Sequence, residues 1–233
     1  MLPLVSATGD GGTISPVLPG SSIKGALRSQ AERIVCTVLN LRDGGDHLQQ
    51  RAVPVVPWLF GSPGQRDDKP DADDTCLKEG LGALTVQDCF PDEVAFTHTQ
   101  WQRVVTAETG RELYAGLKDA GMPDAQRAFH VAIDRWTGGT ADGALYTVLE
   151  PHGVAWQPMH LMVDFRRIPP AEQFVTAALL LLTLRDLSAG RIPLGFGVNR
   201  GMGTVSVKSI VFSVDASDDS PLARLCELSL VDE

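Results

Sequence analysis

The sequence has few cysteines, no long hydrophobic run and no signal-like N-terminus. Its four cysteines lie far apart and form no C-x-x-C pair, which argues against a disulfide framework or a zinc ribbon and favours reduced thiols. The longest nearly apolar run covers residues 175–184, well short of the roughly 20 residues needed to span a bilayer. The segment Met1-Leu2-Pro3-Leu4 lacks the basic and apolar regions of a secretory signal. We therefore expect a cytoplasmic protein with no membrane partner.

Common signatures of catalytic sites are also absent. The five histidines form no H-x-x-x-H pair, and no serine stands in G-x-S-x-G, so neither a zincin nor an α/β-hydrolase is supported. The spacing of Cys76, Cys89 and His98 is too irregular to predict a metal site. We expect neither a metal nor a cofactor.

The chain is acidic, with 20 Lys and Arg against 29 Asp and Glu and a formal charge of −9. An acidic chain is not ordinarily expected to bind nucleic acid, because phosphate neutralisation needs a concentrated basic surface. Five aspartates, however, lie in residues 61–81, which Gly and Pro punctuate and which we interpret as an acidic flexible insertion. The distribution of the basic residues therefore matters more than the net charge.

Hydrophobic periodicity outlines the secondary structure. Apolar residues three and four apart predict helices over 21–40, with Gly20 and two serines as cap candidates, and over 171–189. Alternating apolar residues predict a hairpin of strands 129–133 and 144–149. Further strands are expected over 83–88, 159–165 and 204–214, the last containing a bulge.

The order of these elements predicts an α+β fold in a single domain, residues 1–233. It resembles a ferredoxin-like, RRM-like β-α-β-β-α-β palm, with an inserted region at about 90–157 that carries the hairpin. The first strand is weak or missing, because residues 1–18 hold no convincing apolar alternation. Either residues 2–7 form a ragged strand, or another chain completes the fold.

The start of the first predicted helix is one candidate binding site. Backbone N–H groups at Gly20 and the hydroxyls of Ser21 and Ser22 can bind an anion there. Lys24 and Arg28 lie four residues apart and so share one face of the helix. Lys24 opposes the helix dipole at a cost of about 0.3–1 kcal/mol, which a bound phosphate would relieve. A capped helix with a solvated Lys/Arg face explains these residues equally well.

The glycine-rich loop 195–203 is a second candidate. Its four glycines, Gly201 and Gly203 among them, let the backbone approach a ligand closely. Asn199 and Arg200 supply donors suited to a phosphate or a base edge. The pattern is not G-x-G-x-x-G, so a dinucleotide site is disfavoured. A tight turn between helix and strand is the alternative.

The link between the hairpin strands is a third candidate, because Arg135, Trp136 and Thr137 stand together there. Aromatic and guanidinium planes can stack on bases. A Trp at such a position is nevertheless more often part of a core, so the residues alone favour a buried Trp136.

Four motifs together resemble the RAMP superfamily of CRISPR RNA-guided effector proteins. They are Pro19–Arg28 with the sequence PGSSIKGALR, Leu59-Phe60-Gly61, Ile133-Asp134-Arg135 with Thr137-Gly138, and Gly195–Gly203. The resemblance runs from about residue 9 to residue 214 and is strongest to the backbone subunits of type III effector complexes.

This resemblance implies a ferredoxin-like palm, a thumb hairpin and polymerisation along a guide RNA in antiviral defence. Ser21, Ser22, Lys24, Arg28 and the glycine-rich loop would hold the guide backbone. The hairpin near Arg135 and Trp136 would be the thumb that splays a nucleotide at regular intervals. The implied partners are guide RNA, target RNA and other effector subunits. The family's opening strand is hard to find, which predicts a misplaced start codon or separation from a fused neighbour.

Many such subunits cut target RNA through an aspartate that precedes the Pro-Gly-Ser-Ser motif. Asp10 is the candidate, yet it lies too close to Pro19, and Leu4 or Val5 falls nearer the expected place. We therefore expect an RNA-binding subunit that does not itself cleave the target. One alternative is an endoribonuclease that uses Asp10 or His130 as its base. Another is an assembly protein whose RNA contacts are incidental.

Overall fold

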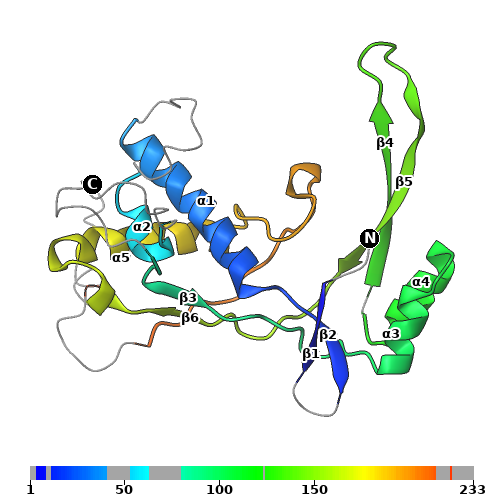
Figure 1. Cartoon of the computed structure of the whole chain (residues 1–233), viewed down its shortest axis with the longest axis horizontal. Coiled ribbons are helices and arrows are strands. Elements are labelled where there is room, and N and C mark those ends of the chain that lie inside the picture. Colours follow the sequence, from blue (N-terminus) through cyan, green and yellow to red (C-terminus); the bar gives the residue numbers. More distant parts are fainter. Residues whose placement is uncertain are drawn as a thin grey trace, which may run out of the picture. The chain divides into compact units, whose positions relative to one another are not determined.

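Helices and antiparallel strand pairs make up the chain, which confirms the expected α+β class. The structure is a computed structural model that describes residues 4–8, 12–40, 53–62, 80–122, 124–213 and 221. Contacts divide it into two units; Figure 1 shows their helices and strands, coloured along the sequence. The first unit comprises Met1–Pro19 and Asp88–Met159, and the second comprises Gly20–Gln87 and His160–Glu233. No described helix is long and apolar enough to cross a membrane.

The first unit combines two antiparallel strand pairs with two short helices. Its elements are β1 (Val5–Thr8), β2 (Thr13–Pro16), α3 (His98–Val105), α4 (Gly110–Asp119), β4 (Asp124–Ile133) and β5 (Thr140–His152). Thr97 and Gln100 form a capping box at the start of α3, which satisfies backbone donors at that end. The core of this unit surrounds Phe96, whose ring meets the Trp101 ring edge-on with centroids 5.2 Å apart.

The second unit packs helices on a short strand pair. Its elements are α1 (Gly20–Val38), α2 (Val56–Phe60), β3 (Leu84–Val86), β6 (Leu161–Val163) and α5 (Pro170–Ser188), with 3₁₀ turns η2 (Phe165–Arg167) and η3 (Val198–Arg200). Buried residues recur every four positions along α1, at Ile23, Leu27, Ala31 and Val35. This stripe faces a core, and α1 contacts α5, β3 and α2.

Both long predicted helices and the hairpin are confirmed, and the strands expected over 83–88 and 159–165 are present in part as β3 and β6, which pair with each other. Residues 5–8 form the strand β1, paired with β2 in a register from Val5 opposite Pro16 to Thr8 opposite Thr13. In the described structure this pair is a separate sheet from β3–β6. The helix α1 begins at Gly20, so the two serines lie within its first turn, and their prediction as caps is wrong.

The strand expected over 204–214 is not formed in its described residues, 204–213. Apolar alternation predicts a strand only where a partner strand is available. In the described part of the chain no strand pairs with this segment, and Val211 is 87% exposed. Most of the predicted acidic insertion, residues 63–79, lies outside the described residues. One domain with an inserted region at about 90–157 remains a prediction.

Candidate nucleic-acid interface

The first turn of α1 rests against the end of β3. A Cβ atom at Gly20 would overlap the Val86 carbonyl, so glycine is required where the helix starts. Ser21 and Ser22 are exposed, and the first turn contains no acidic side chain. The two hydroxyls therefore face solvent, whereas Gly20 itself is buried against the end of β3.

Lys24, one turn further along α1, is held by a backbone carbonyl. Its Nζ donates a hydrogen bond of 2.7 Å to the Leu84 oxygen. No carboxylate in the described part of the chain forms an ion pair with it. Burial lowers the pKa of Lys24, and the positive charges of Arg28 and Arg167 lower it further. The ammonium group thus lies in a field of like charge.

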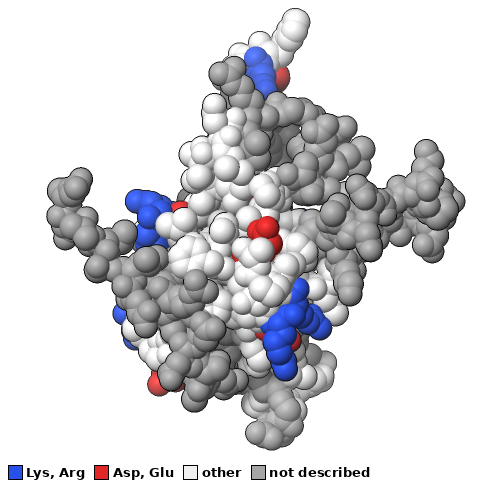
Figure 2. Space-filling view, turned by 90° about the vertical axis from the view of Figure 1, so that its left-hand side faces the viewer, with Lys and Arg blue, Asp and Glu red and all other residues white. Residues whose placement is uncertain are grey.

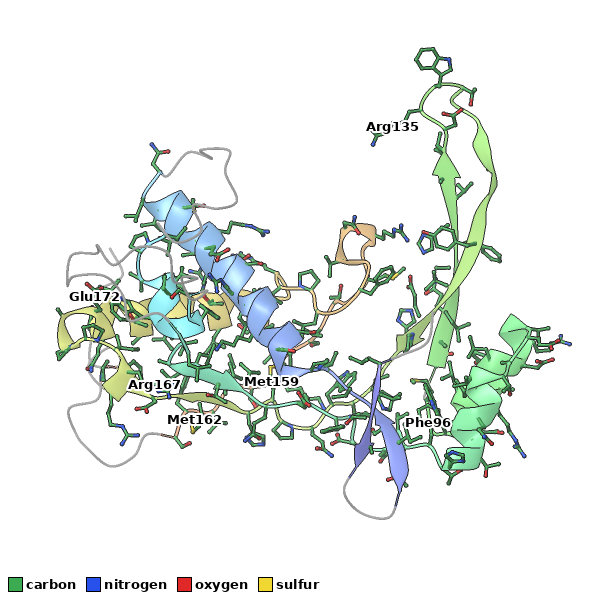
Figure 3. The ribbon with its side chains drawn as sticks, in the orientation of Figure 1. Phe96, Arg135, Met159, Met162, Arg167 and Glu172 are labelled. Atoms are coloured by element: carbon green, nitrogen blue, oxygen red, sulfur yellow. The ribbon has the colours of Figure 1, made fainter. Side chains whose placement is uncertain are left out.

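Arg28 and Arg167 are the two arginines whose charges act on Lys24. The Arg28 guanidinium pairs with Glu32 at 2.8 Å and donates to the Gly61 carbonyl at 3.1 Å. Arg167, in η2, donates to the Gly82 carbonyl at 3.3 Å; Figure 3 shows it beside the ribbon that leads into β3. Sequence reasoning missed Arg167, because nothing in its local sequence indicates that Gly82, 85 residues away, lies beside it.

An open pocket of about 470 Å³ lies in front of Lys24 and Arg28. Backbone from two segments forms its other walls, with lining residues Phe60, Gly61, Ser62, Gly80, Leu81 and Gly82. Gly61 has φ of 90°, and a Cβ there would come 2.6 Å from the Gly80 carbonyl oxygen. A Cβ at Gly82 would overlap the Leu59 carbonyl. Gly61, the glycine of the Leu-Phe-Gly motif, thus lies in the pocket wall next to the cations of α1.

The glycine-rich loop is a tight turn that presents exposed polar side chains. Gly197 and Gly201 both adopt the left-handed conformation on either side of η3. The Leu194 N–H donates to the Gly203 carbonyl at 2.8 Å and closes the loop. The backbone of this loop is therefore a tight turn, as the alternative interpretation expected. The side chains of Asn199 and Arg200 are exposed on it and accessible to a ligand.

The tip of the β4–β5 hairpin is built around Asp134. Its carboxylate accepts hydrogen bonds from the Trp136 backbone N–H at 3.0 Å and from the Thr137 hydroxyl at 2.8 Å. These bonds lower the pKa of Asp134. Trp136 is 95% exposed, so the expectation of a buried ring is wrong. The Asp134 carboxylate therefore accepts hydrogen bonds from within the turn, and the Trp136 ring is exposed to solvent.

On the face that Figure 2 presents, charged side chains of the described residues lie in small groups. The basic groups are separate from one another, and acidic as well as uncharged side chains lie among them. The net charge of −9 therefore does not describe any one part of that face. A ligand at a particular group meets the local charges, because screening at physiological salt reaches about 8 Å.

A family model of the RAMP superfamily matches residues 4–206, most of the chain. The chain belongs to the RAMP superfamily. The four motifs that suggested this family all lie within the matched residues. No curated protein matches the chain. Among solved structures, a chain from a type IV-B CRISPR complex is similar, with a TM-score of 0.47 and 17% sequence identity, covering 99% of this chain and 88% of that one.

In this RAMP protein the structure brings only part of the predicted interface together. Lys24 and Arg28 line one pocket, but none of the residues from Asn199 to Gly203 lines it. Ser21 and Ser22 share the helix α1 with that pocket's cations. Arg135 and Trp136 belong to the other unit of the chain. Of the predicted contacts, the described pocket therefore contains Lys24 and Arg28, and the others remain predictions.

The two residues considered for catalysis have different outcomes. Asp10 lies outside the described residues. His130 lies on β4, with its ring 5.4 Å from the Tyr146 ring and its Nε2 atom buried without a hydrogen-bond partner. Among the described residues, no three His, Cys, Asp or Glu side chains of this RAMP protein gather in a group that could hold a metal ion.

Proposed function

We propose that this RAMP protein is a guide-RNA-binding backbone subunit of a CRISPR effector complex of the type III kind. The supporting observation is the first half of α1, where exposed serines precede Lys24, which shares its surroundings with Arg28 and Arg167. Phosphate groups are the ligand that such a row of hydroxyl and cationic donors suits. In this role the protein acts in cytoplasmic antiviral defence, with target RNA and other effector subunits as partners.

The proposed division of labour needs no base-specific contacts from this chain. Phosphate contacts fix the position of a strand, and base pairing between guide and target reads the sequence. The exposed Trp136 at the hairpin tip is suited to stacking on a base of any identity. Its neighbour Arg135, labelled at the tip in Figure 3, adds a guanidinium group that can stack or bind a phosphate.

Binding of the purified full chain to single-stranded RNA tests this function. Each lost phosphate contact lowers the slope of log affinity against log salt by about 0.7 for single strands. Lys24→Ala combined with Arg200→Ala should therefore lower the slope by about 1.4. The ratio of the RNA affinity of the unchanged protein to that of this double variant should therefore fall about sevenfold between about 50 and 200 mM salt.

A charge-matched control removes two exposed arginines from the short helices of the first unit. Arg103→Ala combined with Arg111→Ala deletes the same charge from α3 and α4 and should leave the slope close to that of the unchanged protein. Equal slopes for both double variants would contradict guide-RNA binding by α1 and the glycine-rich loop. Such a result would favour an assembly protein whose RNA contacts are incidental.

A further inference from the structure

We infer that Arg167 joins Lys24 and Arg28 in binding one phosphodiester group of the guide RNA at the pocket beside Gly61 and Gly82. Arg167 does not itself line the pocket, but its guanidinium donates to the carbonyl of Gly82, which does. The inference rests on the proposed function and adds to it a residue from a different part of the chain. Lys24 and Arg28 come from α1, whereas Arg167 comes from the turn η2 that precedes α5.

The three cations are fixed to the two backbone segments that form the pocket walls or continue from them. Each donates one hydrogen bond to a carbonyl oxygen: Lys24 to Leu84 at 2.7 Å, Arg28 to Gly61 at 3.1 Å, and Arg167 to Gly82 at 3.3 Å. An arginine carries five N–H donors and an ammonium group carries three. A single carbonyl bond therefore orients each side chain and leaves further donors for a ligand.

The charges at this place are not balanced by the described residues. Glu32 pairs with Arg28 at 2.8 Å. Asp164 is shared, at 2.8 Å from Arg166 and 3.9 Å from Arg167. Lys24 has the Leu84 carbonyl as its hydrogen-bond partner and no ion pair among the described residues. A phosphodiester relieves the repulsion among Lys24, Arg28 and Arg167.

The pocket has room for the ligand. Its volume of about 470 Å³ lies within the range of about 300–1,000 Å³ that is usual for small-molecule sites. The pocket therefore accepts a phosphate with its adjoining ribose. Leu81, which is 85% exposed, offers apolar contact on one wall. The glycines at positions 61 and 82 let the two backbone segments of the wall pack closely against each other.

The row of donors along α1 favours a strand over a free nucleotide. Ser21 lies three residues before Lys24, so it shares a side of the helix with Lys24 and lies about 4.5 Å before it along the axis. Ser22, two residues before Lys24, lies on another side of the helix. Ser21 is exposed. A polymer supplies a second phosphate to Ser21, whereas a mononucleotide supplies only one group. We therefore assign the pocket to RNA.

The decisive comparison is between two adjacent arginines. Arg166 is 91% exposed on its side chain and pairs only with Asp164 in the described structure, so Arg166→Ala removes the same charge one residue away without removing a hydrogen bond to a residue that lines the pocket. For Arg167→Ala we expect a salt slope lower by about 0.7. The advantage of the unchanged chain over this variant should shrink about 2.6-fold between about 50 and 200 mM salt. For Arg166→Ala the slope should stay the same.

Three results would overturn the inference. Equal slopes for the two single variants would show that Arg167 makes no phosphate contact. Competition by adenosine monophosphate as effective as that of single-stranded RNA, per phosphate, would assign the pocket to a free nucleotide. If Arg167→Ala does not fold, judged by circular dichroism, Arg167→Gln keeps a donor for the Gly82 carbonyl and is measured in its place. An unchanged slope for that variant counts equally against the inference.

The experiment separates this inference from the proposed function. If Lys24→Ala with Arg200→Ala lowers the slope but Arg167→Ala does not, guide-RNA binding stands and only the role of Arg167 fails. If neither variant changes the slope, the proposed function itself fails.

Discussion

Asp186 is the buried charge on which the second unit depends most clearly. It is 4% exposed, on α5, and accepts a hydrogen bond of 2.8 Å from the Gln30 amide of α1. Arg185 and Arg191 each approach the same carboxylate at 3.1 Å. The carboxylate therefore joins the two long helices to each other and to the residue just beyond α5.

Asp186→Asn keeps the shape of the side chain and removes its charge. The Asn oxygen still accepts the bond from Gln30, so the change replaces a hydrogen bond to a charged group, about 1.5–3 kcal/mol, by a neutral one of about 0.5–1.5 kcal/mol. The two arginines are more than half exposed, so each contributes only about 0.2–1 kcal/mol. We expect a loss of about 1–4 kcal/mol in the free energy of unfolding. For a chain of this size that is a fall of about 2–16 °C in melting temperature.

The pH dependence of this loss follows from the pKa of Asp186. The hydrogen bond from Gln30 and the nearby arginines lower that pKa. The stabilisation is then fully present above the unfolded value of about 3.9 and disappears as the pH falls through the folded pKa. The difference in melting temperature between the unchanged protein and Asp186→Asn should be constant near neutral pH and shrink below about pH 4.

Differential scanning calorimetry at several pH values measures both effects. Asp119→Asn is the control, because Asp119 is exposed at the end of α4. A melting temperature for Asp186→Asn within a degree of this control at neutral pH would refute the role assigned to the buried carboxylate.

Two further changes test the pocket wall and the hairpin tip. Gly82→Ala should lower the melting temperature, because its Cβ would overlap the Leu59 carbonyl. Gly139→Ala is the control and should not lower it, because its Cβ would meet only the Thr137 hydroxyl at 3.6 Å. Equal melting temperatures for the two variants would contradict the close packing at Gly82. Trp136→Ala should leave the melting temperature unchanged because the ring is 95% exposed, yet weaken RNA binding by about 1–3 kcal/mol if the ring stacks on one base. Equal RNA affinity, measured by filter binding, would exclude that contact.

The sequence predicts the long helices because their apolar periods extend over several turns. Burial along α1 follows the predicted stripe residue by residue. The short helices α3 and α4 lack a period of that length, since α3 buries only Val104 and α4 only Gly116 and Leu117. Their capping threonines, Thr97 and Thr109, were the available signal. A cap depends on two or three residues, whereas a period needs several turns to be recognised.

The motif residues were found without the structure, but their surroundings were not. The sequence places Lys24 and Arg28 on one helical face, and that placement is confirmed by the pocket that both line. The third cation, Arg167, reaches them through long-range folding alone. The segment 204–213 shows the converse, because its alternation is local and a strand requires a partner that local sequence cannot supply.

The contrast between an acidic chain and a cationic site leads to a last prediction about salt. At about 0.15 M salt the Debye length is about 8 Å, so a phosphate at Lys24 responds to the cations beside it. At about 0.01 M the Debye length is about 30 Å. The chain's 29 acidic residues, which outnumber its 20 basic ones, then begin to repel the RNA strand. A plot of log affinity for single-stranded RNA against log salt should therefore be linear near physiological salt and flatten towards low salt. A line that stays straight down to about 0.01 M would mean that the acidic residues lie beyond even this longer range, and that the net charge has no part in RNA binding.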